Sequence, residues 1–390
     1  MTVPQIKRFN GLNNVSDPLR LGMSWLVTAD NVNISDTGAI GKREGYTLSQ
    51  AGVYSGVYAT QDYQRMYLVD DGDLRTFDGV VLKTGLSSAP MHWAEINGDA
   101  YFNNGVDRGV ILTDNTLIDW AWSVPTAPNL AAVTGRLTPG LYQVRCTFVL
   151  ADGRETGTSE SNEITLGSDE ALSITDVPHL AGALTKVYIC PPNSTVYQAA
   201  ATTTGSALVW NFSNDALGAD LRTAFFDSLP VGTDVIQFFK GRIYAAQYFP
   251  SQDQTVVWFS ETLAFHLFNL NTDFFILPGQ VLMMAPSDEA LIVGTQAEVY
   301  AYTGEKLTLL ADYGVVAGQH WSRDELGEGK NRILFWTSRG VCAAMPFTNL
   351  TERSVSVAPG IKAGGTIVRH GGQKRYLAVL QQGGSAFNAL

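Results

Sequence analysis

The sequence predicts an all-β protein: a β-propeller of about six blades, closed by an N-terminal hairpin, with a fibronectin type III or immunoglobulin-like β-sandwich inserted into it. Three observations predict this architecture, namely a recurring strand–turn–strand pattern, the spacing of its copies and one long interval of different composition. The pattern is clearest at residues 332–344, where an apolar strand, a polar turn containing Gly340 and a second apolar strand follow one another. Short apolar runs that alternate with glycine-containing turns are typical of antiparallel sheets.

Six copies of this pattern set the spacing. Their approximate centres are Tyr67, Tyr101, Tyr244, Ile292, Leu334 and Leu377. Successive centres are separated by 34, 143, 48, 42 and 43 residues. Three separations match the roughly 40–50 residue period of propeller blades, which hold about four strands each, and one is slightly shorter. The longest separation therefore predicts one blade together with an inserted domain.

Residues 1–22 are predicted to form an extended N-terminal arm. Asn10-Gly11 and Asn13-Asn14 favour turns, and Pro18 moves the residue before it away from helical geometry. An arm of this kind needs another surface to hold it, either its own propeller or a neighbouring subunit. The candidate interface residues of the arm are Leu12, Asn13, Asn14, Asp17, Pro18, Leu19 and Arg20.

The first part of the propeller is predicted at residues 23–124. It begins with a hairpin, in which Val32 and Ile34 alternate with polar residues before an Asp36-Thr37-Gly38 turn. The last repeat, at 365–380, holds only two strands. We therefore expect the hairpin to complete that blade and to close the ring between the two chain ends. Residues 53–86 and 91–122 supply the next two blades.

An acidic turn in the first of these blades allows two interpretations. Hard cations bind several carboxylates in short loops, and Asp70, Asp71 and Asp73 lie close together in the sequence. The stretch lacks the complete EF-hand pattern, so a solvated hairpin turn is favoured over a calcium site.

A change in composition at Val124-Pro125 begins the inserted domain, which is predicted at residues 125–215. About 90 residues suit a small β-sandwich, and subtracting them from the longest separation leaves about one blade. The stretch is rich in Thr, Ser and Ala, and its short strands are expected at Leu141–Leu150, Ser161–Leu166, Thr185–Cys190 and Ala207–Phe212.

The second part of the propeller is predicted at residues 216–390. Its blades are expected at 221–277, 281–315 and 330–358, before the two-stranded repeat near the end. Between two of these blades, the polar stretch Gly318–Gly329 predicts a long surface loop.

Composition and charge exclude several classes of function. The 390 residues carry a net charge of −11 and lack the basic field that binds phosphate backbones, so sequence-specific nucleic-acid binding is not expected. No apolar run approaches the roughly 18 residues of a membrane span, and the N-terminus lacks a signal-peptide core. We therefore expect no membrane span and a chain made in a cytoplasm. Cys146, Cys190 and Cys342 have no CxxC spacing and are predicted to be buried free thiols.

No catalytic constellation emerges from the motifs. The five histidines lack metal-ligand spacing, and no nucleophile elbow, phosphate loop or dinucleotide-binding motif occurs. Paired carboxylates over a propeller axis would suit a glycosidase, although positions in turns explain the acidic residues as well. Exposed tryptophans would suit sugar binding, although core packing explains the tryptophans as well. The residues concerned are Asp227, Glu261, Asp273, Glu298, Trp120, Trp122, Trp258 and Trp336. We assign no catalytic, cofactor-binding or metal-binding residue and expect no enzyme activity.

Four sets of short motifs carry a resemblance to a known family. They are Gly11-Leu12-Asn13-Asn14 with Asp17-Pro18-Leu19; Ala29-Asp30-Asn31-Val32-Asn33-Ile34 running to Arg43-Glu44-Gly45-Tyr46; Gly140-Leu141-Tyr142-Gln143-Val144 with Asp152-Gly153-Arg154-Glu155; and Lys240-Gly241-Arg242-Ile243-Tyr244-Ala245-Ala246. Over most of its length the chain resembles the β-propeller virion proteins of tailed bacteriophages that are called nozzle, stabilisation or minor tail proteins.

The resemblance implies a non-enzymatic structural component of a phage tail, a ring-type protein around the DNA exit channel that acts in virion assembly and genome delivery. The partners it implies are further copies in a homo-oligomeric ring and adaptor, tail or fibre proteins, while DNA passes without sequence-specific binding. It implies no cofactor, and a location in the virion tail that is reached from the host cytoplasm during assembly. An acidic channel would repel DNA phosphates. The alternatives are a receptor- or carbohydrate-binding tail protein and, ranked lower, a propeller glycosidase.

Overall fold

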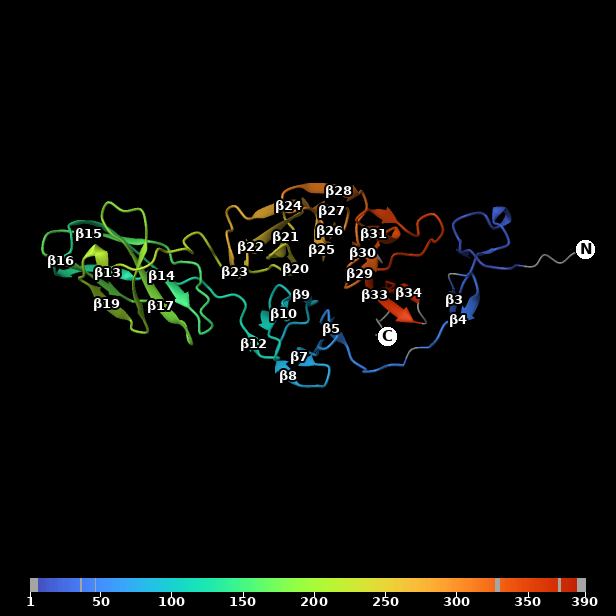
Figure 1. The fold of residues 1–390 in the computed structure, drawn as a ribbon, viewed down its shortest axis with the longest axis horizontal. Coiled ribbons are helices and arrows are strands. Elements are labelled where there is room, and N and C mark those ends of the chain that lie inside the picture. Colours follow the sequence, from blue (N-terminus) through green and yellow to red (C-terminus); the bar gives the residue numbers. More distant parts are fainter. Residues whose placement is uncertain (1–5, 36, 46, 327–329, 371–372, 384–390) are drawn as a thin grey trace, which may run out of the picture.

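The computed structural model is an all-β fold (Figure 1). It describes residues 6–35, 37–45, 47–326, 330–370 and 373–383. Within these ranges the chain forms 34 strands and two 3-10 helices of three residues each, η1 (Pro18–Arg20) and η2 (Asn214–Ala216). No helix in the described part of the chain is long and apolar enough to cross a membrane.

Five antiparallel sheets, which we call repeat sheets 1 to 5, follow one another along the chain. Sheet 1 contains β5 (Tyr54–Ala59), β6 (Met66–Asp70), β7 (Asp73–Thr76) and β8 (Val81–Lys83). Sheet 2 contains β9 (His92–Ile96), β10 (Asp99–Asn103), β11 (Arg108–Ile111) and β12 (Leu117–Ile118). Sheet 3 contains β20 (Ile236–Phe239), β21 (Arg242–Phe249), β22 (Gln254–Glu261), β23 (Ala264–Phe268) and β24 (Phe274–Pro278), the last two both paired with β22.

The remaining repeats have the same order of strands. Sheet 4 contains β25 (Val281–Pro286), β26 (Leu291–Thr295), β27 (Val299–Tyr302) and β28 (Leu307–Ala311). Sheet 5 contains β29 (Ser322–Leu326), β30 (Lys330–Thr337), β31 (Gly340–Ala344) and β32 (Thr348–Asn349). A final hairpin contains only β33 (Lys362–His370) and β34 (Gln373–Gln381).

The six repeat centres predicted from the sequence occupy equivalent places. Tyr67, Tyr101, Tyr244, Ile292 and Leu334 lie in the second strand of their sheets, and Leu377 lies in the second strand of the final hairpin. An Asn97-Gly98 turn joins the first and second strands of sheet 2, with φ of 53° and 88°. Both angles are positive, as a two-residue hairpin turn of the type that matches strand twist requires.

A buried apolar cluster joins each repeat sheet to the next. Tyr67 of sheet 1 packs in one cluster with Phe102 of sheet 2, and Tyr244 of sheet 3 packs in another with Val293 of sheet 4. Sheets 2 and 3, and sheets 4 and 5, are joined in the same way. A smaller cluster, formed around Trp336, joins sheet 5 to the final hairpin. No cluster formed by the described residues joins the final hairpin to sheet 1.

Between sheets 2 and 3 the chain forms a two-sheet insert at one end of the molecule (Figure 1). One sheet contains β13 (Asn129–Thr134), β16 (Glu170–Thr175) and β19 (Ala207–Trp210), and the other contains β15 (Asn162–Leu166), β14 (Gly140–Val149), β17 (Leu184–Cys190) and β18 (Gln198–Thr203). Side chains from both sheets, such as Tyr142 and Leu172, share one buried cluster. The four strands expected in this region are confirmed to within two residues at each end, whereas β13, β16 and β18 were not expected.

Close main-chain packing fixes the junction between the insert and sheet 3. His266 Nε2 donates to the carbonyl oxygen of Glu155 over 3.1 Å. Arg154 lies 4.5 Å over the ring of Trp122. A Cβ atom added at Gly157 would lie 1.8 Å from the carbonyl oxygen of Phe226, so only glycine allows the two segments to approach so closely.

The N-terminal hairpin forms as predicted, but it does not complete the last repeat in this chain. β3 (Val32–Ile34) pairs with β4 (Ile40–Lys42), and the two form a separate two-stranded sheet. The expected closure is therefore wrong for the single chain. The arm itself holds the hairpin, because the amide of Phe9 donates to the carbonyl oxygen of Gly38 over 2.8 Å.

The stretch Gly318–Gly329 was predicted to be a surface loop, and this prediction is wrong for residues 322–326, while residues 327–329 lie outside the described residues. It contains β29, which pairs with β30 from Ser322 opposite Leu334 to Leu326 opposite Lys330. The strand was missed because its polar residue Asp324 is buried and compensated by ion pairs, so apolar alternation is lost.

Candidate interaction surface

The N-terminal segment, residues 6–53, has no apolar core of its own. Among its described residues only Asn13 and Gly38 are buried. Leu19 is 95% exposed and Val53 is 88% exposed. The other large apolar side chains that this segment exposes are Ile6, Val15, Met23, Val27, Ile40 and Leu48. Single exposed apolar residues are common, but a run of about 50 residues that buries none lacks the usual stabilisation of a folded unit.

Two of the candidate interface residues, Leu12 and Asn13, hold the arm together. Gly11–Leu12, which form β1, pair in parallel with β2 (Trp25–Leu26). The amide of Asn13 donates to Leu26 O over 2.7 Å. Its side-chain Oδ1 accepts from the amides of Val15 and Ser16 at 3.2 and 3.0 Å. The extended arm predicted from the sequence thus contains short elements that the sequence did not indicate.

Four further candidates, Asp17, Pro18, Leu19 and Arg20, form a projecting turn. Asp17 Oδ1 accepts from the amide of Leu19 at 3.0 Å and caps η1, which begins with Pro18. Arg20 and Asp17 approach to 3.8 Å with both side chains exposed, so this ion pair contributes little stability. The turn presents Leu19 to solvent.

Asn14 connects the arm to the far end of the chain. Its amide donates to Ser354 O over 3.0 Å, and its side chain both donates to Ser356 O and accepts from Ser356 N, at 2.9 and 2.7 Å. An asparagine side chain can satisfy both main-chain groups of one residue in this way. The contact anchors the N-terminal segment to the segment between β32 and β33, which we call the anchor loop (residues 350–361).

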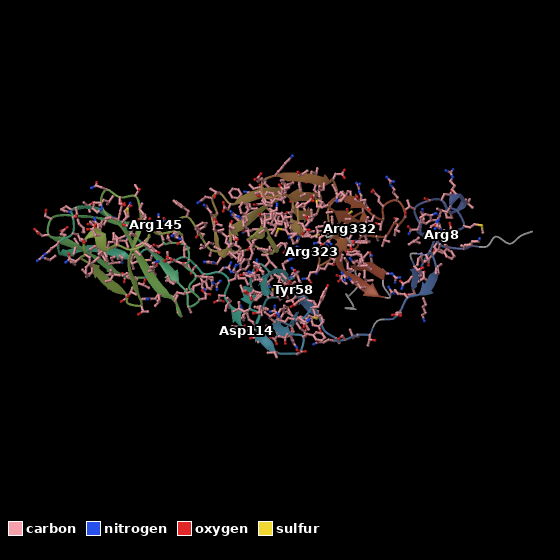
Figure 2. The ribbon with its side chains drawn as sticks, in the orientation of Figure 1. Arg8, Tyr58, Asp114, Arg145, Arg323 and Arg332 are labelled. Atoms are coloured by element: carbon pink, nitrogen blue, oxygen red, sulfur yellow. The ribbon has the colours of Figure 1, made fainter. Side chains whose placement is uncertain are left out.

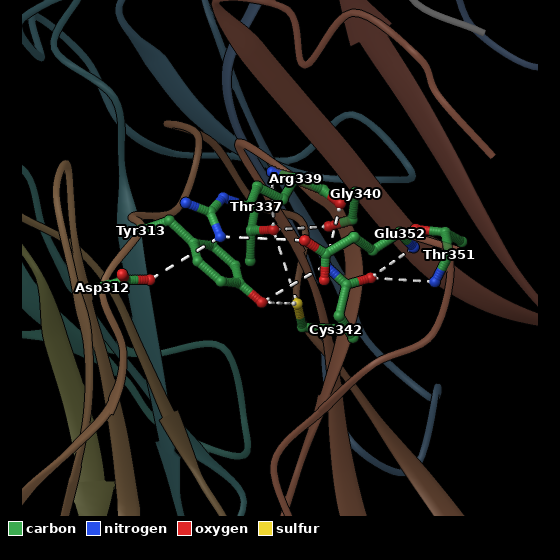
Figure 3. Close-up of polar contacts among 9 residues, drawn as sticks. Asp312, Tyr313, Thr337, Arg339, Gly340, Cys342, Thr351 and Glu352 are labelled. Carbon is green, nitrogen blue, oxygen red and sulfur yellow. Dashed lines mark hydrogen bonds and ion pairs between the residues drawn. The ribbon is translucent and has the colours of Figure 1, made fainter. Parts of the chain in front are cut away.

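A polar cluster holds the start of the anchor loop against sheet 5 (Figure 3). Thr351 Oγ1 accepts from the amide of Val341 over 3.0 Å. Arg339 lies 4.4 Å over the ring of Tyr313 and forms ion pairs of 3.9 Å with Asp312 and Glu352. These contacts hold the start of the anchor loop, to which Asn14 binds, against sheet 5.

The final hairpin lies beside the anchor loop and is held along its β33 edge. The amides of Ala363 and Gly365 donate to Ala317 O and Gln319 O, at 2.8 and 2.9 Å. Among the described residues β34 pairs only with β33. None of the residues from Lys374 to Gln381 is buried, whereas β26, the equivalent second strand of sheet 4, is buried throughout.

A buried histidine links sheet 5 to the final hairpin. His320 Nδ1 accepts from the amide of Trp336 at 3.0 Å, and Nε2 donates to Val316 O at 2.6 Å. The carbonyl oxygen of His320 accepts from the hydroxyl of Tyr376 on β34. Burial lowers the pKa of His320 to about 4, and this dominates the opposing effect of the bond to Val316. The ring is therefore neutral at pH 7, with its proton on Nε2.

Asp324 provides a second link to the final hairpin. Its carboxylate accepts from Arg332 Nε at 2.7 Å and from Lys374 Nζ at 3.0 Å. Burial alone would raise the pKa of Asp324, but the two cationic donors outweigh burial and lower it. Figure 2 shows Arg323 and Arg332 in this region and Arg8 in the N-terminal segment, toward the end of the molecule opposite Arg145 of the insert.

Several of the residues considered for sugar binding or hydrolysis are buried or are paired with other side chains. Trp120 and Trp336 are buried, which confirms the core interpretation for these two, and the ring of Trp122 is covered by Arg154. Asp273 pairs with Arg242 at 3.3 Å, and Glu298 accepts from the hydroxyl of Tyr300. For Asp227, burial and then the charge of Glu160 raise the pKa.

The acidic stretch forms a hairpin turn, and the cysteines are buried free thiols, as predicted. Asp71 and Gly72, with φ of 50° and 80°, form the hairpin turn between β6 and β7. Asp70 and Asp73 both face Arg75, at 3.3 and 4.0 Å. The three cysteines are free and buried. Within the described ranges, no group of three or more His, Cys, Asp or Glu side chains could hold a metal ion.

Sequence reasoning missed Ser354, Ser356, His320 and Asp324. A serine in a polar loop gives no signal of its own, and His320 was treated only as one of five scattered histidines. The interval between His320 and Trp336 is too long for a local motif, so the hydrogen bond between them follows from strand pairing alone.

Known proteins share little sequence with the chain. No family model and no curated protein matches it. Among solved structures it is similar to the extracellular domain of a candidate one-component system, BT4673 of B. thetaiotaomicron, at 12% identity and a TM-score of 0.29, over 82% of this chain and 36% of that one. It is also similar to a candidate 6-phosphogluconolactonase of Bacteroides uniformis, at 9% identity and a TM-score of 0.35, over 87% and 92% of the two chains. A third is apo AztD of Citrobacter koseri, at 9% identity and a TM-score of 0.27, over 80% and 87%.

Proposed function

We propose that this chain is a structural subunit of a bacteriophage tail, of the nozzle or ring type, which acts by protein–protein contacts in virion assembly and genome delivery. The observation that carries the proposal is the N-terminal segment. It exposes many of its large apolar side chains, buries none of them fully and is tied to the body through Asn14. A segment of this kind gains apolar burial when a neighbouring subunit covers it.

The five repeat sheets and the final hairpin support a six-bladed β-propeller as the body of this subunit. Each sheet packs on the next through a buried cluster, and the equivalent residues lie in equivalent strands. The two packed sheets of the insert support our proposal of a sandwich of fibronectin type III or immunoglobulin kind. The insert lies at one end of the packed sheets, and the segment without an apolar core lies at the other. These two ends offer separate surfaces for different partners.

The proposed role requires binding rather than chemistry. The expected partners are further copies of the chain and other tail proteins, and DNA passes through the channel without sequence-specific contacts. The net charge of −11 suits a channel wall that repels phosphates. This part of the proposal predicts a channel face with more carboxylates than cationic side chains.

Immunogold electron microscopy of intact virions tests the proposed function. An antibody against the insert is preferable, because the insert lies away from the N-terminal segment (Figure 1). We expect gold on the tail axis as a collar or tube segment. Gold on peripheral fibres would instead favour the receptor-binding alternative, and virions whose dissociated proteins lack this chain would refute the proposal.

A further inference from the structure

We propose that the body, which consists of the five repeat sheets and the final hairpin, opens and closes at a seam between the final hairpin and sheet 1. The side chain of Gln319 acts as the latch of this seam. The inference goes beyond the proposed function and does not depend on it, because it concerns a movement within one copy of the chain.

The latch connects the first strands of the last and the first repeat. The amide of Gly365 in β33 donates to Gln319 O over 2.9 Å, so Gln319 lies against the final hairpin. Its side-chain Nε2 donates to Met91 O over 3.2 Å. The amide of Met91 in turn donates to the carbonyl oxygen of Ser55 in β5 over 3.0 Å. Gln319 thus reaches sheet 1 through one intervening residue.

Sheet 1 presents an apolar wall on the face that points away from sheet 2. Tyr67 and Val69 of β6 pack toward sheet 2, so Met66 of the same strand points to the other face. Val57 and Val81 share that face through strand pairing. Met66 is 37% exposed, and Val57 and Val81 are 41% and 48% exposed. This wall is therefore open to solvent.

The final hairpin presents a second apolar wall. Ala378 and Leu380 of β34 pack toward sheet 5 in the cluster around Trp336. Leu377 and Val379 alternate with them along the strand and so point to the opposite face. Both are only half-buried. The repeats on the two sides of the latch thus each keep an apolar face partly open to solvent.

The seam should be the weakest interface of the body. Between sheets 1 and 2, Tyr67 and Phe102 are completely buried, and burial of apolar surface is the main source of stability at such an interface. Across the seam the described residues form one hydrogen bond, and it comes from the exposed side chain of Gln319. A hydrogen bond of this kind adds little net stability. Regions with little buried apolar surface open at low free energy.

Opening at the seam would leave the buried clusters between the repeats intact. The repeats on each side would move as packed units about a few contact residues, which is a common form of conformational change in proteins. Closing the seam would bury the two apolar walls against each other. The body can therefore change its width, and the amount of apolar surface it shows, without local unfolding.

Distance measurement by double electron–electron resonance tests this inference on the full chain. Nitroxides are attached through p-acetylphenylalanine at Asp78 of sheet 1 and at Ile361 beside the final hairpin, both of which are exposed. The labelled chain is diluted into excess unlabelled chain, so that only distances within one copy are measured. The control pair is Thr262 and Gln296, which are exposed in turns of sheets 3 and 4, two sheets that a buried cluster joins.

We expect two distances for the seam pair, one for the open and one for the closed body, and a single narrow distance for the control pair. Gln319→Glu keeps the size of the side chain but has no N–H group to donate to Met91 O. It should raise the ratio of open to closed molecules by roughly 2- to 10-fold, as the loss of one hydrogen bond implies. The matched variant Gln252→Glu adds the same charge at an exposed position of sheet 3 and should leave the ratio unchanged.

Three results would overturn the inference. A single narrow distance for the seam pair in both the wild type and Gln319→Glu would show that the body does not open there. Equal broadening of the seam and control pairs would show general loosening rather than a seam. A ratio that Gln319→Glu leaves unchanged would show that Gln319 is not the latch. None of these results bears on the proposed function, which the immunogold experiment tests separately.

Discussion

Replacing His320 by Asn should remove a defined part of the pH dependence of folding stability. The buried ring is neutral in the folded chain, because its Nδ1 must accept from the amide of Trp336. The amide oxygen of Asn can take over that acceptor role without titrating between pH 4 and 7.

The magnitude follows from the two pKa values. The unfolded chain takes up the proton near the ordinary value of 6.5, and the folded chain does so only at about 4. The contribution of this residue is therefore complete above pH 6.5 and is lost as the pH falls toward 4. Between pH 7 and pH 4.5 the wild-type free energy of unfolding should fall by roughly 2 kcal/mol on account of this group.

The His320→Asn variant should lack that fall, although it should be less stable by about 1–3 kcal/mol at pH 7, since the carbonyl group of Val316 loses its donor. Urea unfolding followed by tryptophan fluorescence at the two pH values measures the difference. Hydrogen exchange in peptides 362–370 and 374–381 separates this transition from unfolding of the insert.

The matched control is His179→Asn, because His179 is exposed. A His320→Asn chain that loses as much stability between pH 7 and pH 4.5 as the wild type would refute the reasoning. If the variant does not fold, a 15N NMR titration of the wild-type ring tests the same point, and a ring that is protonated on both nitrogens at pH 6 would contradict it.

Three further predictions concern the links between parts of the chain. Asp324→Asn should weaken the contacts to Arg332 and Lys374 and destabilise the chain by about 1–2 kcal/mol, with faster hydrogen exchange in 374–381. The exposed control Asp78→Asn should change neither the stability nor the exchange. Gly157→Ala should lower stability by about 1–3 kcal/mol in thermal unfolding, because the added Cβ would meet Phe226 O. The control is Gly45→Ala, where the space is open, and an equal effect there would argue against this cause. Asn14→Ala should release the arm, so that limited proteolysis at 43–53 becomes several-fold faster. The folding stability of the body should fall by less than about 1 kcal/mol. Unchanged cleavage would show that the arm is held elsewhere.

The repeats could be predicted from the sequence because they depend on local chemistry. Tyr67 and Tyr244 each stand in an apolar run that alternates with turn residues, and this pattern alone places them in a strand. The turn at Asn97-Gly98 was predictable for the same reason, since both residues tolerate positive φ.

The missed features depend on contacts between distant residues. Asn14 and Ser356 are separated by 342 positions, and no property of either residue indicates the other. Asp324 is buried as a charged residue, which contradicts the usual pattern of a strand unless its two cationic partners are known. The position of β3–β4 was mispredicted because counting strands shows which sheet is incomplete but does not show where the missing pair lies.

The succession of apolar clusters has a consequence for how the molecule comes apart. Apart from the insert, each sheet packs mainly on its neighbours in the sequence, as in a linear array whose stability is a sum of units and of the interfaces between them. The last interface, around Val316, Trp336 and Ala363, is the smallest of these clusters. Unfolding of a single copy should therefore begin at its C-terminal unit and spread backward, so a neighbour that caps this unit would raise the resistance of the whole array to heat and to mechanical load.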